Sequence, residues 1–88
     1  MVIIIMSNQV FEQIEVITHF HNLEMEIIKF KWRDSVYNVS AVNSRWKIPW
    51  HNSIKYHFSV ICTKQNVICE LSYFPPDFLW ELIQYDNL

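Results

Sequence analysis

The chain of 88 residues contains no glycine. At an average usage of ~7%, a protein of this length would contain about six. Motifs built on glycine are therefore excluded, among them the phosphate-binding loop, the dinucleotide-binding fingerprint and the nucleophile elbow. Turns that need a positive φ must instead use Asn or Asp, the next most tolerant residues. Five such residues separate the apolar segments: Asn22, Asp34, Asn43, Asn52 and Asn66.

The sequence also lacks a long apolar run. Its N-terminal run, Met1–Met6, has six residues, whereas a membrane-spanning helix needs about 20 and a secretory signal needs a charged start and a longer apolar core. We interpret Met1–Ile5 either as part of an edge strand or as residues that precede a translation start at Met6. Without an export signal, the two cysteines are expected to be reduced thiols of a cytoplasmic protein that does not associate with a membrane.

Length and composition indicate a single domain over residues 1–88. Hydrophobic residues make up 51% of the chain and aromatic residues 16%, which suffices for one core and is untypical of disordered proteins. We expect the core to span about residues 14–86, with residues 1–10 either disordered or forming an edge strand.

Charge is distributed unevenly along the chain. Residues 1–28 carry four acidic residues and no Lys or Arg, residues 29–55 carry six basic residues against one Asp, and residues 56–88 are again acidic. Such a charge dipole suits partner orientation or homo-association, whereas tight nucleic-acid binding usually requires a strongly basic domain.

Apolar and polar residues alternate along much of the sequence. In the segments 28–33, 37–41 and 54–62 every second residue is apolar, and many of these residues are β-branched or aromatic. This period of two is typical of strands with one buried and one solvated face.

Matching the apolar faces predicts how the first strands pair. A turn at Arg33-Asp34 places Phe30 opposite Tyr37. An earlier strand over Ile14–Phe20 is expected to pair with Glu26–Trp32 through a turn near Asn22. Further along the chain, a two-residue turn at Gln65-Asn66 would place Cys62 opposite Cys69 and Val60 opposite Leu71.

These patterns predict an all-β fold, a single antiparallel meander of about six strands that is strongly curled or barrel-like. The longest irregular connection is expected over Asn43–Ser53. The C-terminal region has an alternative, because Pro75-Pro76-Asp77 is a plausible helix start. A helix at about residues 77–85 would make the fold α+β.

The order of the aromatic residues resembles a small bacterial domain of unknown function. Its pattern matches Phe30, Trp32, Arg33, Tyr37 and Val39, then Arg45-Trp46, Trp50, Lys55-Tyr56, Val60, Glu70-Leu71, Trp80, Leu82 and Tyr85-Asp86. The resemblance covers roughly residues 14–86 and implies a small antiparallel β fold with a C-terminal strand. Similar domains occur at the ends of proteins related to error-prone repair polymerases, which implies some association with nucleic acid or repair complexes. The chain departs from the family at Asp34 and Asn66, where glycine is usual, and at Trp50-His51, where Trp-Trp is common.

Three of the four tryptophans lie within a basic and aromatic segment, residues 30–58. Alternation divides this segment, because it places Phe30 and Trp32 in the core and the neighbouring lysines on the solvated face. The tryptophans of the expected loop are better candidates for exposure, since aromatic faces and cations together bind unpaired bases or acidic partners. The candidate binding residues are Arg45, Trp46, Lys47, Trp50 and His51.

No metal, cofactor or catalytic site is expected. His19 and His21 share a strand face, and Cys62 would face Cys69, but neither pair has the four closely spaced ligands typical of zinc. His57 falls on the face opposite Cys62, so a Cys–His nucleophile is not expected.

The sequence therefore predicts a non-enzymatic binding or docking module. The expected partner is another protein or a second copy of the chain. The alternative is a single-stranded nucleic-acid-binding or repair-associated accessory protein.

Overall fold

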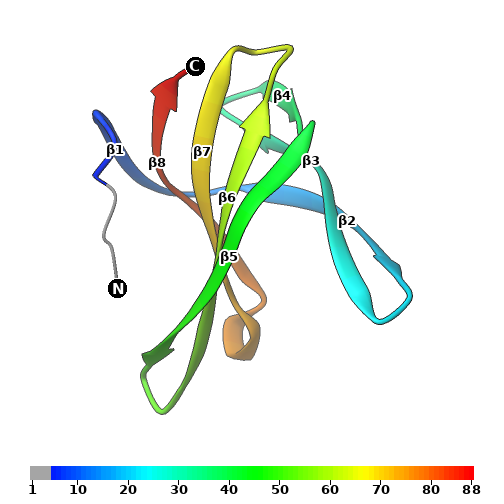
Figure 1. Cartoon of the computed structure of the whole chain (residues 1–88). Coiled ribbons are helices and arrows are strands. Elements are labelled where there is room, and N and C mark those ends of the chain that lie inside the picture. The colour runs from blue at the N-terminus through cyan, green and yellow to red at the C-terminus, as the bar shows by residue number, and fades with distance from the viewer. Residues whose placement is uncertain (1–4) are drawn as a thin grey trace.

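The structure, a computed structural model, describes residues 5–88 and is all-β, with antiparallel strand pairs throughout these residues. Its strands are β1 (Asn8–Gln13), β2 (Glu15–His21), β3 (Glu24–Trp32), β4 (Ser35–Asn38), β5 (Ala41–Trp50), β6 (Ser53–Cys62), β7 (Val67–Phe74) and β8 (Leu79–Asn87). They form a five-stranded sheet in the order β1-β8-β7-β6-β5 and a three-stranded sheet in the order β2-β3-β4 (Figure 1).

The predicted all-β antiparallel fold is confirmed, but the strands are grouped differently from the expected meander. After β1 the chain leaves the five-stranded sheet, builds the three-stranded sheet and returns at β5. The described residues thus form eight strands in two separate sheets. Hydrogen bonding between their strands does not close either sheet into a barrel. The prediction for Met1–Ile5 concerns mostly residues 1–4, and these lie outside the described part of the chain.

The C-terminal segment is a strand, so the alternative of a helix at 77–85 is wrong. Pro75–Asp77 forms a single 3-10 turn, which ends where Phe78 adopts the left-handed conformation (φ 50°, ψ 37°). From Leu79 onward, β8 pairs with β7 on one side and with β1 on the other. The backbone hydrogen bonds to β7 and β1 favour a strand more strongly than Pro75-Pro76-Asp77 favours a helix.

The pairing predicted for the first hairpins agrees with the structure. Phe30 lies opposite Tyr37, and β2 pairs with β3 through a turn after His21. The β6–β7 register is wrong by two residues, because the turn contains four residues, 63–66, and Cys62 faces Val67 while Val60 faces Cys69. A shift of two keeps each side chain on its predicted face.

The expected irregular connection over Asn43–Ser53 is also wrong. Residues 41–50 form β5, an edge strand paired with β6 along its length, and the break is confined to His51 and Asn52. Pro49 lies in this strand. Proline is tolerated on an edge strand because its missing N–H can face away from the ladder.

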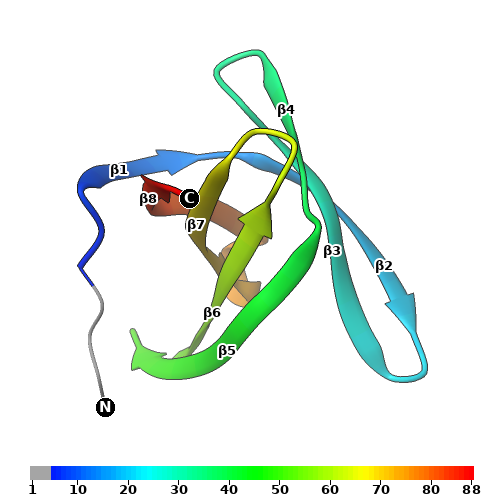
Figure 2. The same cartoon turned by 45° about the horizontal axis from the view of Figure 1, so that its top comes forward.

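The core lies between the two sheets. Phe30 of β3 stacks on Tyr37 with ring centroids 5.0 Å apart, and Glu12 of β1 links the sheets by accepting a hydrogen bond from Trp32 Nε1 (3.0 Å). The buried apolar cluster consists of Ile14, Ile27, Phe30, Phe58, Val60, Cys62, Val67, Cys69, Leu71 and Leu82. The three-stranded sheet covers one face of the five-stranded sheet (Figure 2), and the opposite face carries the candidate site.

Three two-residue hairpin turns are built without glycine. Both central residues have positive φ in Asn22-Leu23 (49° and 63°), Arg33-Asp34 (50° and 63°) and His51-Asn52 (45° and 58°). Positive φ at both positions is typical of the type I′ turn, whose twist matches that of paired strands. Of the five Asn and Asp residues that were predicted to have positive φ, four do. The prediction is wrong for Asn43, which lies within β5.

Leu23 is an unfavourable turn residue. It adopts a positive φ, which is costly for a residue with a Cβ, and its side chain is 91% exposed, so packing does not offset that cost. We expect Leu23→Asn to raise the free energy of unfolding by about 1 kcal/mol, since Asn tolerates this conformation better. Urea denaturation at equilibrium measures the change. Leu23→Ala is the control, because it removes the same side chain and keeps the backbone penalty. A less stable Leu23→Asn protein would contradict the turn assignment.

Candidate functional site

The outer face of the five-stranded sheet carries two rows of side chains that cross all five strands. The register places directly opposed residues side by side on one face of a sheet. In strand order β5 to β1, the first row is Ser44, Ser59, Glu70, Gln84 and Gln9, and the second is Trp46, His57, Ser72, Glu81 and Gln13. This face is therefore largely polar at its centre, in contrast to the apolar face that packs on the other sheet.

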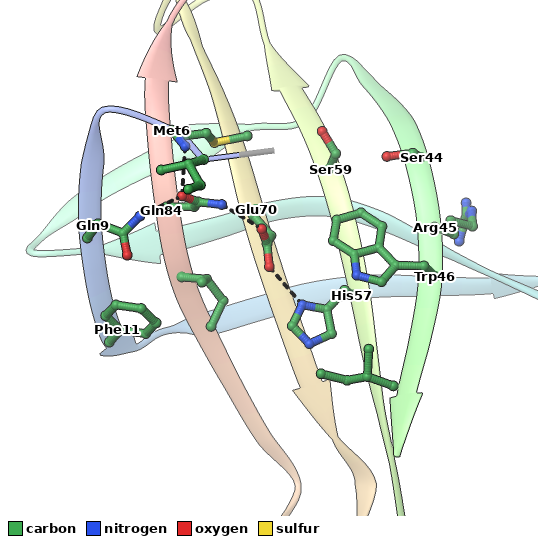
Figure 3. Close-up of a pocket in the computed structure, with 13 residues that line it drawn as sticks. Met6, Gln9, Phe11, Ser44, Arg45, Trp46, His57, Ser59, Glu70 and Gln84 are labelled. Atoms are coloured by element: carbon green, nitrogen blue, oxygen red, sulfur yellow. Dashed lines mark hydrogen bonds and ion pairs between the residues drawn. The ribbon is translucent and has the colours of Figure 1, made fainter. Parts of the chain in front are cut away.

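A hydrogen-bonded network runs along these rows (Figure 3). His57 Nδ1 and Gln84 Nε2 each lie 2.8 Å from one carboxylate oxygen of Glu70. Gln84 Oε1 accepts hydrogen bonds from Gln9 Nε2 and from the backbone N–H of Met6, both at 2.9 Å. The network joins β6, β7, β8 and β1 and attaches the segment before β1 to the sheet.

Glu70 is the buried charge of this network, with 12% of its side chain exposed. Burial raises the pKa of its carboxyl, but hydrogen bonds from His57 and Gln84, with the charges of His57 and Lys55, outweigh burial and hold the pKa below its ordinary value. The carboxylate is therefore ionised at neutral pH and can only accept hydrogen bonds. His57 Nδ1 must then carry the proton that it shares with Glu70.

The second ring nitrogen of His57, Nε2, is enclosed and makes no hydrogen bond to the described residues. The side chain is 8% exposed, and Nε2 has no hydrogen-bond partner among residues 5–88. The hydroxyl of Ser72, directly opposite His57 on β7, is buried and likewise has no partner within that range. Buried polar atoms are usually hydrogen-bonded, so these two atoms, which have almost no solvent-accessible surface, are exceptions among the described residues.

A cavity of about 600 Å³ lies over this network. Its walls are mainly apolar and include Trp46 and Ile48 of β5 on one side, and Phe11 and Ile83 on the other, with Met6 above. Trp46 stacks on the imidazole of His57 with centroids 5.4 Å apart and planes 22° apart. Figure 3 shows Phe11 and Trp46 on opposite sides of the Glu70–Gln84 row. An apolar enclosure with a few polar groups at its base is the usual form of a small-molecule site.

Phe11 is placed at the cavity by an irregularity in β1. The register with β8 shifts between Gln9 and Glu12, and Phe11 adopts a φ of 55° while remaining 61% exposed. A bulge of this kind re-aims a side chain, and positive φ is costly for an aromatic residue. Such strain is concentrated at functional sites.

The structure brings two of the five predicted binding residues to this cavity. Trp46 forms one wall, and Arg45 lies at its edge. The Arg45 guanidinium, however, turns toward the other sheet, where it donates to the carbonyl of Met25 (3.1 Å) and lies 5.7 Å from the ring of Phe58.

The other three predicted residues lie elsewhere. Lys47 falls on the face opposite Trp46, with its ammonium 5.9 Å from the ring of Tyr56. Trp50 and His51, at the end of β5, contact each other edge to face at 4.9 Å. The predicted patch is thus divided by strand alternation, because β5 is a strand and not a loop.

The remaining candidate groups form no site within residues 5–88. Cys62 and Cys69 are free thiols buried in the core, and the hydrogen bond that they share, together with burial, raises the pKa of Cys69. His19 and His21 stack at 5.7 Å on the exposed surface of β2. No cluster of three or more His, Cys, Asp or Glu that could hold a metal ion is found in the described residues.

Sequence reasoning missed His57 and Glu70. It placed His57 on the face opposite Cys62 without a partner, and it did not bring Glu70 near it, because the predicted β6–β7 register was two residues out. In the correct register Glu70 lies opposite Ser59 and diagonal to His57. A four-residue turn would have placed the two side chains within reach, but alternation alone does not choose between the two registers.

The chain matches no known protein-family model, no curated protein sequence and no solved structure. The resemblance to the small bacterial domain therefore stays a prediction. Between residues 5 and 88 there is no helix long and apolar enough to cross a membrane.

The lowered pKa of Glu70 predicts a loss of stability in acid. The ionised form is favoured in the folded state, so its stabilisation is present above the unfolded pKa of about 4.3 and is lost as pH falls through the lower folded value. We expect Glu70→Gln to be about 1–3 kcal/mol less stable than the wild type at pH 7, since hydrogen bonds to a charged group are lost. The difference should shrink below pH ~4, as measured by urea denaturation at several pH values.

The matched control is Glu24→Gln, which changes an exposed carboxyl at the β2–β3 turn. Its stability difference from the wild type should stay small at every pH. A Glu70→Gln difference that is constant from pH 3 to pH 7 would contradict an ionised, stabilising Glu70.

Proposed function

We propose that this protein is a non-enzymatic binding module of the cytoplasm, and that its ligand occupies the cavity on the outer face of the five-stranded sheet. The observation that carries the proposal is the cavity of about 600 Å³, whose mainly apolar walls include Trp46 and Phe11 and whose lining includes the hydrogen-bonded Glu70. Apolar walls with a few polar groups are the usual form of a small-molecule site. The free thiols of both cysteines support a reducing compartment.

Binding is better supported than catalysis. A carboxylate that orients a histidine is also found in catalytic triads, and His57 with Glu70 has that geometry. A covalent mechanism further needs a hydroxyl or thiol within hydrogen-bond reach of the second ring nitrogen. No group of residues 5–88 lies within that reach of Nε2.

Single-stranded nucleic-acid binding has less support. It needs aromatic faces and cations on one surface. Trp46 lies on the cavity side of β5, whereas Arg45 and Lys47 contact rings and a carbonyl on the opposite side. The aromatic face and these two cations therefore do not share one surface.

The cavity is expected to bind the neutral fluorescent probe N-phenyl-1-naphthylamine at a single site, because its walls are apolar and aromatic. Trp46→Ala should weaken binding by about tenfold, since it removes one wall and the stacking on His57. Trp50→Ala is the control, because Trp50 lies outside the cavity lining. Fluorescence titration measures both. Equal affinity in the two variants, or no saturable binding to the wild type, would contradict the proposal.

A second candidate function, self-association, is favoured by the β2–β3 hairpin. Its exposed apolar residues include Ile17 (54%), Phe20 (69%) and Leu23 (91%). Exposed apolar clusters of this kind mark contact surfaces. The hairpin also carries the exposed charges Glu24, Glu26 and Lys31, so two copies of it could pair opposite charges around the apolar residues.

We expect the wild type to form a dimer at high micromolar concentration in sedimentation velocity, and Leu23→Asn to shift it toward the monomer. Phe78→Asn is a matched control, because Phe78 is also an exposed apolar residue (82%) at positive φ (50°) but lies at the 3-10 turn. Dissociation by both variants alike, or a monomeric wild type, would remove the hairpin as the contact.

A further inference from the structure

Strand β5 leaves one of its two edges unpaired. It is the last strand of the five-stranded sheet and pairs only with β6 within the described residues. Because Trp50 and Ser53 flank a two-residue turn, they form a hydrogen-bonded pair, and every second residue before Trp50 likewise directs its backbone groups toward β6. The N–H and C=O groups of Arg45 and Lys47 therefore point toward the open edge.

The part of this edge that can pair with another strand is short. Pro49 has a carbonyl but no N–H, and the register with β6 shifts between Val42 and Ser44. Proline and bulges at a sheet edge discourage the pairing of long strands. The usable edge is thus confined to residues 44–48, which suits a short extended segment and opposes open-ended growth of the sheet.

The cavity lies beside this edge. Its wall on the β5 side includes Ser44, Trp46 and Ile48, which are alternate residues and share one face of the strand. The opposite wall comes from β1, the other edge strand of the sheet, and includes Phe11 (Figure 3). A strand added along β5 would direct every second side chain to this same face and so into the cavity.

The other face of β5 carries two positive charges without a negative partner. Arg45 and Lys47 are both exposed, and neither takes part in an ion pair of residues 5–88. Their contacts are with neutral groups, namely the carbonyl of Met25 and the rings of Phe58 and Tyr56. An added strand would place its remaining side chains opposite these cations, where acidic residues are complementary.

We infer that the occupant of the cavity is an extended segment of a partner protein with alternating apolar and acidic residues, which pairs antiparallel with the open edge of β5. The inference rests on the proposed binding function, for which it names the partner. The apolar side chains enter the cavity beside Trp46, and the acidic side chains lie opposite Arg45 and Lys47. A strand suits this place because it has two faces, as β5 does, whereas a compact ligand would leave the open edge and the cations unused. Antiparallel pairing is the more stable arrangement per residue.

Synthetic peptides with blocked ends test the inference. The test peptide is Glu-Val-Glu-Leu-Glu-Val-Glu. One control has the same residues in the order Val-Leu-Val-Glu-Glu-Glu-Glu, and the other has Lys in place of every Glu. Each is titrated into the full chain with bound N-phenyl-1-naphthylamine, and the loss of fluorescence gives its affinity. We expect the test peptide to bind about tenfold more tightly than either control.

Charge reversal on β5 provides a test by gain of binding. Lys47→Glu should weaken binding of the test peptide by about fivefold, and should bind the Lys peptide more tightly than the wild type does, which a misfolded protein cannot do. Lys64→Glu is the matched control, because Lys64 is exposed in the turn at the other end of β6, and it should keep the wild-type preference. If Lys47→Glu does not fold, the methylated peptides described next still decide.

Methylation of the peptide backbone shows whether a strand is added. In antiparallel pairing, the acidic residues opposite Arg45 and Lys47 direct their N–H groups toward β5. N-methylation of these acidic residues should abolish displacement of the fluorescent probe. N-methylation of the apolar residues should change the affinity by less than about twofold, because their N–H groups point away from β5.

The outcomes separate the two levels of the proposal. If N-phenyl-1-naphthylamine binds but the test peptide does not displace it at millimolar concentration, the cavity is a binding site and the inferred partner is wrong. The inference is also wrong if a control peptide, or the peptide methylated at its acidic residues, binds as tightly as the test peptide. Displacement of the probe by raising the protein concentration alone would assign the place to a second copy of the chain and overturn the inference. If the probe itself does not bind, the proposed function is wrong.

Discussion

The ionised carboxylate of Glu70 is the group on which the outer face of the molecule depends. A buried charge is tolerated only when it is paired and hydrogen-bonded, and here the partners come from neighbouring strands on both sides, His57 of β6 and Gln84 of β8. These bonds fix which nitrogen of His57 is protonated and orient Gln84 to hold Met6 and Gln9. The hydrogen bonds that stabilise the Glu70 carboxylate therefore also hold in place the polar side chains at the base of the cavity.

The faces of the strands could be predicted from the sequence because side-chain direction has a period of two. Phe30, Phe58 and Leu71 alternate with polar residues, and all three are buried in the core. The β3–β4 register was predictable as well, since a turn at Arg33-Asp34 leaves one pairing that matches large apolar residues. The β6–β7 register was not, because a shift of two residues preserves every face and so cannot be detected by alternation.

The candidate site was only partly predictable for a related reason. Alternation distinguishes the face that packs on the core from the other face, but it cannot say that the other face is itself enclosed. His57 and Ser59 look like surface residues in the sequence, yet both are buried. Trp46 from β5 stacks on the ring of His57, and both residues lie in the lining of the cavity. Trp46 was predicted as a binding residue because it was expected in an exposed loop, whereas its role as a wall of the cavity depends on β5 being a strand.

The pairing of β1 with β8 has a consequence for how the protein is made. The Met6–Gln84 hydrogen bond joins residues 78 positions apart, and β1 has no neighbour in its sheet other than β8. β1 can therefore find its place in the sheet only after β8, more than 60 residues later, has been synthesised. Contacts of such long sequence separation form slowly. The three-stranded sheet needs only the consecutive strands β2 to β4, whereas the cavity needs β1 and β8 paired beside β5 to β7.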